Sequence, residues 1–449
     1  MTQNPPFVAR LLRRFTHTQD GAITSFGIFL VIAMICVGGL GLDVANAIMV
    51  RTHLQVAADS AAHAALVARE YRTEAESKAI AITIASQSLP PSKFGTTIEA
   101  GDITFGTWDA ATQVFTASPG SDDAVLVNTQ RLAGRGNSVG TFFLRFIGMN
   151  HLDVISQSVF ETYYPTCFLE GFVAQDIVDI QSNNTYDDGF CIHSNTHVEV
   201  NNGNTFLDGV IVSMPNRGDL VIPSSVPGAN PGLQDALRSG AYRLRVLNRI
   251  DDIIANVEDP SSDYFRTAYV DIDPLTGDPE VVTFSKNDRI QDIWVEGAIH
   301  KATCNAANQT ITLSANQSVH KGVIVTNCQV SLGANSLITD VIIVTENTNT
   351  DSIKGGSGAQ IGLDDGCSPG GGAQLVTLGG FTSAANLAIY GGQIIAAKTI
   401  DFESRADGIE GVSMVAGEEI DGTSLMNMGF CGGLGMENNF MAEYFRLAT

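Results

Sequence analysis

The pattern of apolar and polar residues divides this chain into three parts. An apolar run without any charged residue extends over the 21 residues from Ala22 to Leu42. A helix rises 1.5 Å per residue, so this run is about 31 Å long and matches the hydrocarbon core of a bilayer. Residues 43–165 show helical and then alternating periodicity, and residues 166–431 hold short apolar runs between polar turns. The pattern predicts a transmembrane helix at residues 21–42, followed by a mainly β part.

The charges beside the apolar run predict its orientation. Three arginines precede it, whereas Asp43 and a lone Arg51 follow it; the three are Arg10, Arg13 and Arg14. The positive-inside rule then makes residues 1–20 a cytoplasmic tail and places the bulk of the chain outside. Signal cleavage at residues 45–47 and prepilin-type cleavage after Gly21 are alternatives. The run is too long for a signal peptide, and Phe26 stands where pilin-type segments carry Glu, so an uncleaved anchor is favoured.

Residues 43–165 predict a helix and a small α+β domain. Small and apolar residues recur every three or four positions on one helical stripe: Ala47, Val50, Leu54, Ala57 or Ala58, Ala61, Ala65 and Ala68. This stripe packs either on the next domain of the same chain, which we favour, or on other helices in a homo-oligomer. The helix is expected to continue through residues 69–88 to Pro90-Pro91. Short β-branched runs then predict strands, with a short helix at residues 142–148, in a layout similar to that of pilins or of any small α+β domain.

Residues 166–431 repeat a short apolar strand and a polar turn with a period near 20. The clearest strands, at residues 323–325, 342–344 and 361–363, lie about 19 residues apart. Such a period is typical of a β-solenoid, here a right-handed β-helix-like body, and a β-sandwich is the alternative. Residues 233–286 form an insert, with a helix over 233–257 and a hairpin over 264–285. The basic side of that helix is expected to pair with the protein's own carboxylates; its residues are Arg238, Arg243, Arg245 and Arg249. Residues 432–449 form a C-terminal tail.

Charge and cysteine content limit the partners and the compartment. The chain has 25 Lys and Arg against 48 Asp and Glu, a net charge of −23, so it should not bind nucleic acid. Six of its seven cysteines follow the apolar run, which suits disulfides in an oxidising compartment, although six reduced cysteines remain an alternative. Two pairs have the same spacing of 24 residues, which favours disulfides Cys167–Cys191, Cys304–Cys328 and, as the remaining pair, Cys367–Cys431.

No catalytic, cofactor or metal motif emerges from the sequence. Asp364-Asp365, Asp401, Glu403 and Asp407 form the strongest acidic candidates for a hydrolytic pair, but solvated turns carry such residues by default. His193 and His197 lack further residues that would complete a metal site, and the cysteines show no C-x-x-C spacing. We therefore expect no enzyme activity, no cofactor and no metal.

The N-terminal region resembles the TadE/TadG-like proteins of Flp (tight-adherence) pilus assembly. The resemblance covers roughly residues 13–70 and rests on D-G-A-I at 20–23, L-D-V-A at 42–45 and R-x-x-L-Q-x-A-A-D at 51–59. The positions that carry it are Asp20, Gly21, Asp43, Arg51, Leu54, Gln55 and Asp59. It implies a bacterial inner-membrane anchor with a periplasmic body that works with other pilus-assembly proteins or pilins. The metal motif D-x-S-x-S, which many TadG-like proteins carry, is missing.

Two hypotheses follow for the function. In the first, the protein is a non-enzymatic, membrane-anchored component of Flp-type pilus assembly with a role in adhesion. In the alternative, it is a membrane-tethered β-solenoid that binds a glycan or another surface. A solenoid hydrolase is a third and weaker hypothesis.

Overall fold

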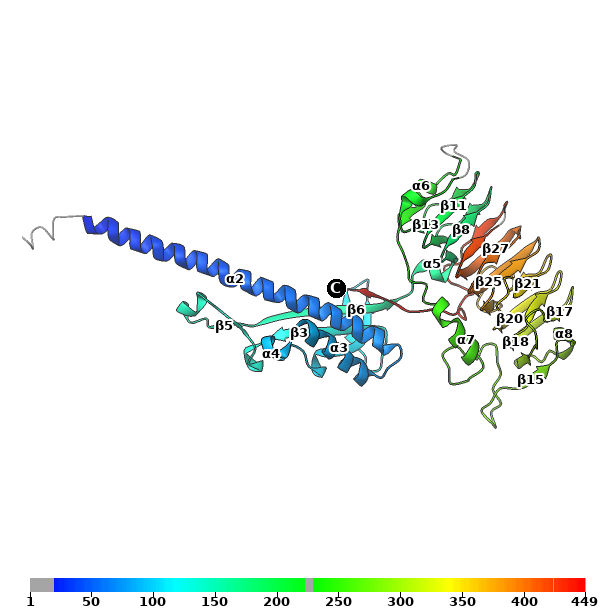
Figure 1. Ribbon diagram of the computed structural model, residues 1–449, viewed down its shortest axis with the longest axis horizontal. Coiled ribbons are helices and arrows are strands. Elements are labelled where there is room, and N and C mark those ends of the chain that lie inside the picture. Colours follow the sequence, from blue (N-terminus) through cyan, green and yellow to red (C-terminus); the bar gives the residue numbers. More distant parts are fainter. Residues whose placement is uncertain (1–19, 223–228, 423, 449) are drawn as a thin grey trace, which may run out of the picture. The chain divides into compact units, whose positions relative to one another are not determined.

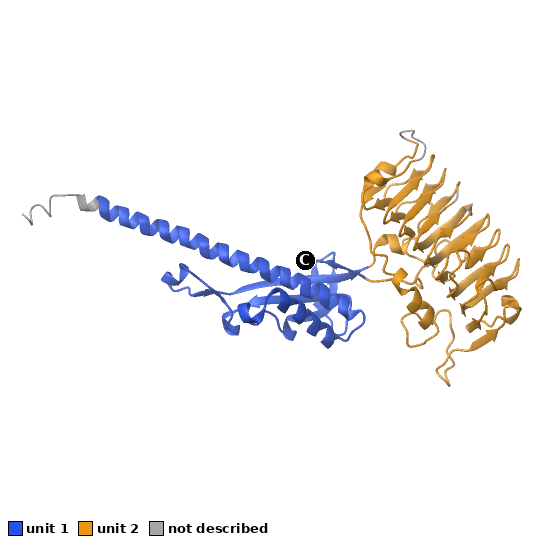
Figure 2. Cartoon of the chain, in the orientation of Figure 1, with its two compact units in different colours: residues 1–163, 444–449 blue, residues 164–443 orange. Residues whose placement is uncertain are grey.

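The computed structural model describes residues 20–222, 229–422 and 424–448, so most of the expected tail at residues 1–20 lies outside the described residues. The chain forms two compact units, shown in Figure 2: residues 1–163 with 444–449, and residues 164–443. The expected boundary at 165/166 is two residues from the observed one. The expected C-terminal tail divides instead between the two units.

Unit 1 is built on a helix of 50 residues, α2 (Asp20–Arg69). Its apolar part is long enough to cross a membrane. The expectation that this helix continues to Ser88 is wrong, because a separate helix, α3 (Glu74–Ser88), begins after a turn. Thr73 and Glu76 form a capping box, in which the Thr73 hydroxyl accepts the N–H of Glu76 and the Glu76 carboxylate accepts the N–H of Thr73, and this pair favours a new helix start.

An antiparallel sheet of five strands packs against α2 in unit 1. Its order is β2 (Val114–Ala117), β1 (Ile103–Asp109), β3 (Ala124–Arg131), β6 (Val154–Tyr163) and β30 (Tyr444–Leu447). The last strand comes from the expected tail and pairs Tyr444 with Tyr163. A hairpin of β4 (Val139–Gly140) and β5 (His151–Leu152) holds a 3-10 turn, Leu144–Ile147, where a short helix was expected. Short helices α4 (Pro91–Phe94) and Ala100–Asp102 lead into the sheet.

The alanine stripe is the surface through which α2 packs. Ala57, Ala61 and Ala65 have no solvent exposure, and they share buried clusters with residues of α3 and of the sheet. Small side chains let a helix backbone approach a sheet closely. The favoured interpretation, packing within the same chain, matches the structure. A homo-oligomer would need another face of this helix.

Unit 2 is a β-solenoid of about 13 turns (Figure 1), as the 20-residue period predicts. One parallel sheet contains, in spatial order, β14 (Leu237–Ser239), β13 (Ile211–Met214), β10 (Cys191–Ser194), β7 (Gly171–Ala174), β27 (Ser404–Ala416), β25 (Leu387–Ala396), β22 (Gln360–Ile361), β20 (Leu337–Thr345), β18 (Ser318–Thr326), β16 (Ile299–Ala302) and β15 (Val281–Phe284). Strands β23 (Ala373–Thr377), β9 (Thr185–Tyr186), β12 (Thr205–Phe206) and β29 (Asn427–Gly429) extend it.

The second parallel sheet follows the same spatial order. It contains β11 (His197–Val200), β8 (Ile177–Ile180), β28 (Glu419–Asp421), β26 (Ile400–Asp401), β24 (Phe381–Ser383), β21 (Ile353–Gly355), β19 (Gln329–Leu332) and β17 (Thr310–Leu313). A single apolar cluster runs through all turns between the two sheets. Stacking thus buries a core that no single turn could bury alone.

The turns are not stacked in the order of the sequence. The chain enters the solenoid in the middle, at β7, and winds outward to β14. It then crosses to the opposite end, begins again at β15 and winds back until β27 pairs with β7. Figure 1 shows orange-red β27 beside the green strands for this reason.

The 19-residue period holds only in part of the stack. Val323 pairs with Ile342, 19 residues later, but Ile342 then pairs with Gln374 rather than with Ile361. Ile361 lies opposite Ile338, at another position of the turn. The loop that carries Cys367 lengthens this turn, so the regular spacing of the third apolar run was coincidental.

The insert differs from its prediction. The expected helix over 233–257 is wrong: a short helix α6 (Leu233–Ala236), strand β14, and a later helix α7 (Ile250–Asn256) replace it. Leu237 pairs with Val212 at the end of the sheet, and this pairing outweighs its helical spacing. The expected hairpin over 264–285 shrinks to a bridge between Ile272 and Pro279, because β15 pairs in parallel with β16. A short helix, α8 (Ile290–Ile293), precedes β16.

The last residues of unit 2 pack on the face of the first sheet that points away from the apolar core. Gln393 of β25 donates to the carbonyl of Phe440 over 2.9 Å and accepts from its N–H over 2.7 Å. Arg249 forms an ion pair of 2.5 Å with Glu443, which supports the expectation that arginines of the insert pair with the protein's own carboxylates. We call residues 436–443 the return segment.

All three favoured disulfides are present: Cys167–Cys191, Cys304–Cys328 and Cys367–Cys431. Among the described residues, only Cys36 in the apolar run is free. The first two bonds link neighbouring turns, and the third links the long loop after β22 to Cys431, which lies five residues before the return segment.

We predict that Gln393→Leu loosens the return segment. Leucine leaves the N–H and C=O of Phe440 unpaired, at a cost of about 1–3 kcal/mol for each buried group. Hydrogen exchange of residues 436–442 should become faster by at least tenfold. Gln317→Leu, at an exposed position, is the matched control and should leave exchange unchanged. Equal exchange in Gln393→Leu and wild type would contradict this role of Gln393.

Candidate functional site

The residues of the family resemblance attach α2 to the sheet of unit 1. Leu54 is 1% exposed, and its carbonyl accepts a hydrogen bond of 2.8 Å from Thr129 of β3. Gln55 donates to the carbonyl of Gln157 on β6 over 3.0 Å, and to the carboxylate of Asp59 over 2.8 Å. One helical turn separates Gln55 from Asp59, so the acid can orient the amide toward the strand. These positions therefore dock the helix.

Other positions of the resemblance lie along the same helix. Asp20 and Gly21 stand at its beginning, and the carbonyl of Arg51 accepts a hydrogen bond of 3.1 Å from Ser156 of β6. Asp43 is 1% exposed, and its carboxylate accepts the N–H groups of Phe142, Phe143 and Leu144 over 2.6, 2.9 and 2.7 Å. Sequence alone assigns Asp43 to a motif but does not show that it caps a turn 100 residues later.

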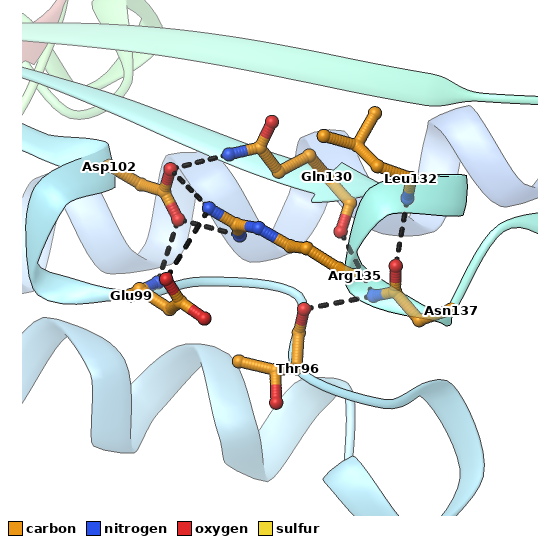
Figure 3. Close-up of polar contacts among 7 residues, drawn as sticks. All are labelled: Thr96, Glu99, Asp102, Gln130, Leu132, Arg135 and Asn137. Carbon is orange, nitrogen blue, oxygen red and sulfur yellow. Dashed lines mark hydrogen bonds and ion pairs between the residues drawn. The ribbon is translucent and has the colours of Figure 1, made fainter.

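A second polar cluster of unit 1, shown in Figure 3, is centred on Asp102. Arg135 contacts both carboxylate oxygens over 2.8 and 2.9 Å, and Gln130 donates to the same carboxylate. The hydrogen bonds to Asp102 raise the pKa of Arg135. Asn137 completes the cluster by binding the N–H of Leu132 and the carbonyl of Thr96. The donors and acceptors satisfy one another, which is typical of a structural network.

Four carboxylates line up across successive turns of the solenoid. Strand register places Asp401, Asp421, Asp179 and Glu199 directly opposite one another on β26, β28, β8 and β11. Neighbouring strands are about 4.8 Å apart, and these four strands contain no Lys or Arg. We call this row the carboxylate ladder.

Burial and mutual repulsion favour protonation within the ladder. Burial, together with the charges of Asp421, Glu199 and Glu419, raises the pKa of Asp179 to about 6. Burial and the charge of Asp421 also raise the pKa of Asp401. The amide of Gln181 bridges Asp179 and Asp421 over 3.1 and 3.2 Å. The cavity beside Asp179 has a volume of only about 10 Å³, so no sugar ring fits there.

The acidic candidates from the sequence do not converge. Asp401 joins the ladder on β26, whereas Asp364 is exposed in the loop after β22, and Asp365 binds the N–H of Ser368 in that loop. Asp407 binds Asn427 on β29 over 2.5 Å. The sequence therefore identifies Asp401 as one member of the ladder. The other members lie on β28, β8 and β11, and the sequence does not show that these strands are neighbours.

The histidines occupy structural positions. His193 is fully buried and lies 2.7 Å from Ser213 and 3.0 Å from Asn195. The arrangement of Ser213, His193 and Asn195 resembles a hydrolytic triad. Ser213 is only 4% exposed, however, so a substrate cannot reach its hydroxyl. Burial lowers the pKa of His193. His197 instead pairs with Glu199 over 3.1 Å at the end of the ladder, so the two histidines do not share a site.

One group of metal-binding residue types assembles among the described residues: Cys367, Cys431 and Glu410. The two cysteines form a disulfide, so their thiolates are not available to a metal. Glu170 lies beside this bond, fully buried, and accepts the N–H groups of Cys431 and Gly433 over 2.7 and 3.3 Å. Burial raises the pKa of Glu170 to about 7. Glu170 thus links the residues that follow β29 to the residues that precede β7.

Comparison with known proteins gives two matches. Residues 171–432, more than half of the chain and nearly all of the solenoid, match the family described as a domain of unknown function (DUF7867). Residues 21–70 match the family described as putative Flp pilus-assembly TadE/G-like, and this range coincides with α2. No curated protein matches the chain.

We predict that Leu54→Ala destabilises unit 1. Removing a fully buried leucine costs about 2–4 kcal/mol, because a cavity remains between α2 and the sheet. Val56→Ala is the control, since Val56 is 56% exposed on the same helix; it should change stability by less than about 0.5 kcal/mol. Urea unfolding of the full chain in detergent measures both. Equal unfolding midpoints would show that Leu54 does not support docking.

We predict a pH-dependent gain from Asp179→Asn. A raised pKa means that the folded protein binds the proton more tightly than the unfolded chain, where the pKa is about 3.9. The contribution of Asp179 to stability is therefore complete below that value and is lost as the pH rises through about 6. Asparagine avoids this loss, so the variant should exceed wild type by about 1–2 kcal/mol near pH 7.5, allowing for solvent screening, and by nothing near pH 3.5.

Urea unfolding of the full chain at both pH values tests the role of the ladder. Asp364→Asn is the matched control, because this exposed aspartate lies outside the ladder. It should show no pH-dependent difference. If Asp179→Asn were less stable than wild type near pH 7.5, the ladder would not be repulsive.

Proposed function

The chain belongs to the family of the domain of unknown function DUF7867, and we propose that it couples this solenoid to an Flp-type pilus-assembly machine as a membrane-anchored, non-enzymatic component. The observation that carries the proposal is the TadE/G-like match over residues 21–70. That segment forms both the apolar anchor and the helix face that packs on the sheet. The part related to pilus assembly is therefore built into the fold of unit 1.

Charge and cysteine chemistry support a place in the bacterial inner membrane. The arginines before the apolar run favour a cytoplasmic N-terminus. The three disulfides favour a periplasmic location for the solenoid, because such bonds persist in oxidising compartments. With this orientation, the solenoid and the part of unit 1 that follows the apolar run lie on the periplasmic side, where they can contact other assembly proteins.

The burial and internal pairing of the polar groups in both units favour a scaffolding role over catalysis. The Asp102 cluster is satisfied internally, the buried His193 and Ser213 are out of reach of a substrate, and the carboxylate ladder borders a cavity too small for a sugar. The partners in this proposal are Flp pilins or other assembly proteins, and their contact supports adhesion by the assembled pili.

Deletion of the gene tests the proposal. Surface pili and attachment to surfaces should fall at least tenfold, and a plasmid copy of the wild type should restore both. A copy that lacks residues 171–432 but keeps unit 1 should reach the membrane and fail to restore pili. Normal pili after deletion would overturn the proposal. Normal pili combined with lost binding to a glycan array would favour the tethered binding protein instead.

Orientation is tested by fusions in the full chain. Alkaline phosphatase attached after Thr449 should be active, and a fluorescent protein that folds only in the cytoplasm should be dark at the same position. The opposite result would place the solenoid in the cytoplasm.

A further inference from the structure

The tip of the β4–β5 hairpin in unit 1 is an apolar surface that the described residues of its own unit leave largely exposed. The tip comprises residues 141–149. Four of its apolar side chains are between 47% and 76% exposed: Phe142, Phe146, Ile147 and Met149. Exposed apolar patches mark contacts with membranes or with other proteins.

Two contacts fix this tip to the outer end of the apolar run. The Asp43 carboxylate accepts the three N–H groups at the start of the turn. Beyond Asp43, the ring of Phe143 lies directly on the backbone of Gly39. A Cβ at Gly39 would lie 2.2 Å from Cγ of Phe143, so only glycine permits this contact. Gly38 and Gly41 have no such neighbour within 4 Å.

The position of Gly39 sets the depth of the tip. Gly39 lies three residues inside the end of the apolar run at Leu42, which corresponds to about 4.5 Å along the helix axis. Amphipathic segments at a membrane interface bury their apolar side by about 5–10 Å. The tip therefore stands level with the boundary between headgroups and acyl chains if the apolar run spans the bilayer.

The chemistry of the tip fits that boundary. Its backbone is hydrogen-bonded within the turn: the N–H groups of Phe146, Gly148 and Met149 bind the carbonyls of Phe143, Arg145 and Leu144. A segment that leaves water must satisfy its backbone in this way. The exposed Arg145 lies over the ring of Phe146 at 5.5 Å and supplies a cation at headgroup level.

We propose that the exposed apolar side chains of the tip insert into the membrane interface at the Leu42 end of the segment with which α2 spans the bilayer. The occupant is lipid, because Gly39 and Asp43 hold the tip at the end of the apolar run, where Leu40 and Leu42 of the helix are also about half exposed. The tip then acts as a second membrane contact, which Asp43 holds against the helix. This inference rests on membrane anchorage by α2 and is independent of a role in pilus assembly.

Spin labels on the full chain in vesicles of phosphatidylethanolamine and phosphatidylglycerol test the proposal. Phe146→Cys combined with Cys36→Ser reports on the tip. Wild-type Cys36 marks the interior of the span, because it is the free cysteine of the described residues and lies within the apolar run. Leu275→Cys combined with Cys36→Ser marks water, since Leu275 is 93% exposed in unit 2.

The expected result is a graded depth. Oxygen should relax the label at position 146 more strongly than a water-soluble nickel complex, although less strongly than the label at Cys36. The label at position 275 should favour nickel. If the label at 146 behaves like the label at 275 while Cys36 remains buried in lipid, the tip proposal is overturned and anchorage stands. If position 146 is shielded from both reagents, a protein covers the tip and the proposal also fails.

Failure of anchorage itself has a different signature. In that case Cys36 and position 146 would both favour nickel. A second variant tests the role of Asp43: Asp43→Ala in the Phe146→Cys, Cys36→Ser background removes the acceptor of three N–H groups. It should broaden the range of label depths and raise label mobility at position 146, with no change at position 275. Unchanged spectra would show that Asp43 does not position the tip.

Discussion

Residues Ser413–Ala416 of β27 pair in parallel with Gly171–Ala174 of β7, and the continuity of the solenoid depends on this seam. The seam joins two stacks that are remote in sequence. Without it, each stack would present an open edge of unpaired backbone groups, which promotes association with other chains. Side chains reinforce the seam. Asn184 accepts from the N–H of Met426 across it, and its own N–H binds Asn204 in the next turn. Glu170 holds the backbone at Cys431 in the same region.

Local and periodic features of this fold were predictable from the sequence. The apolar run of α2, the strands of unit 1 and the solenoid follow from hydrophobic periodicity, which reports how each segment is buried. The disulfide spacing of 24 residues matches one turn with its corner, so Cys167–Cys191 and Cys304–Cys328 could be paired before the structure was known. These features depend on neighbours within about 30 residues.

Features that depend on distant partners were not predictable. Leu237 has helical spacing but pairs with Val212, and residues 444–447 look like a tail but complete the sheet beside β6. The carboxylate ladder exists because Asp179 and Asp421 share a register position across the seam. The resemblance identified Asp43, Leu54, Gln55 and Asp59 as a pattern, yet their roles in holding a turn and docking a helix come from residues on β3, β6 and the hairpin tip.

The return of the chain to β6 also bears on how the protein is made. Strand β6 pairs with β30 and β7 pairs with β27, and in each case the partner lies more than 200 residues later in the chain. Neither sheet is therefore complete until these later strands have been synthesised. Contacts of such long range form slowly, because the loop must close before the pairing stabilises it. Until then one edge of β6 and one edge of β7 remain open, which makes this interval the period in which a chaperone would matter most.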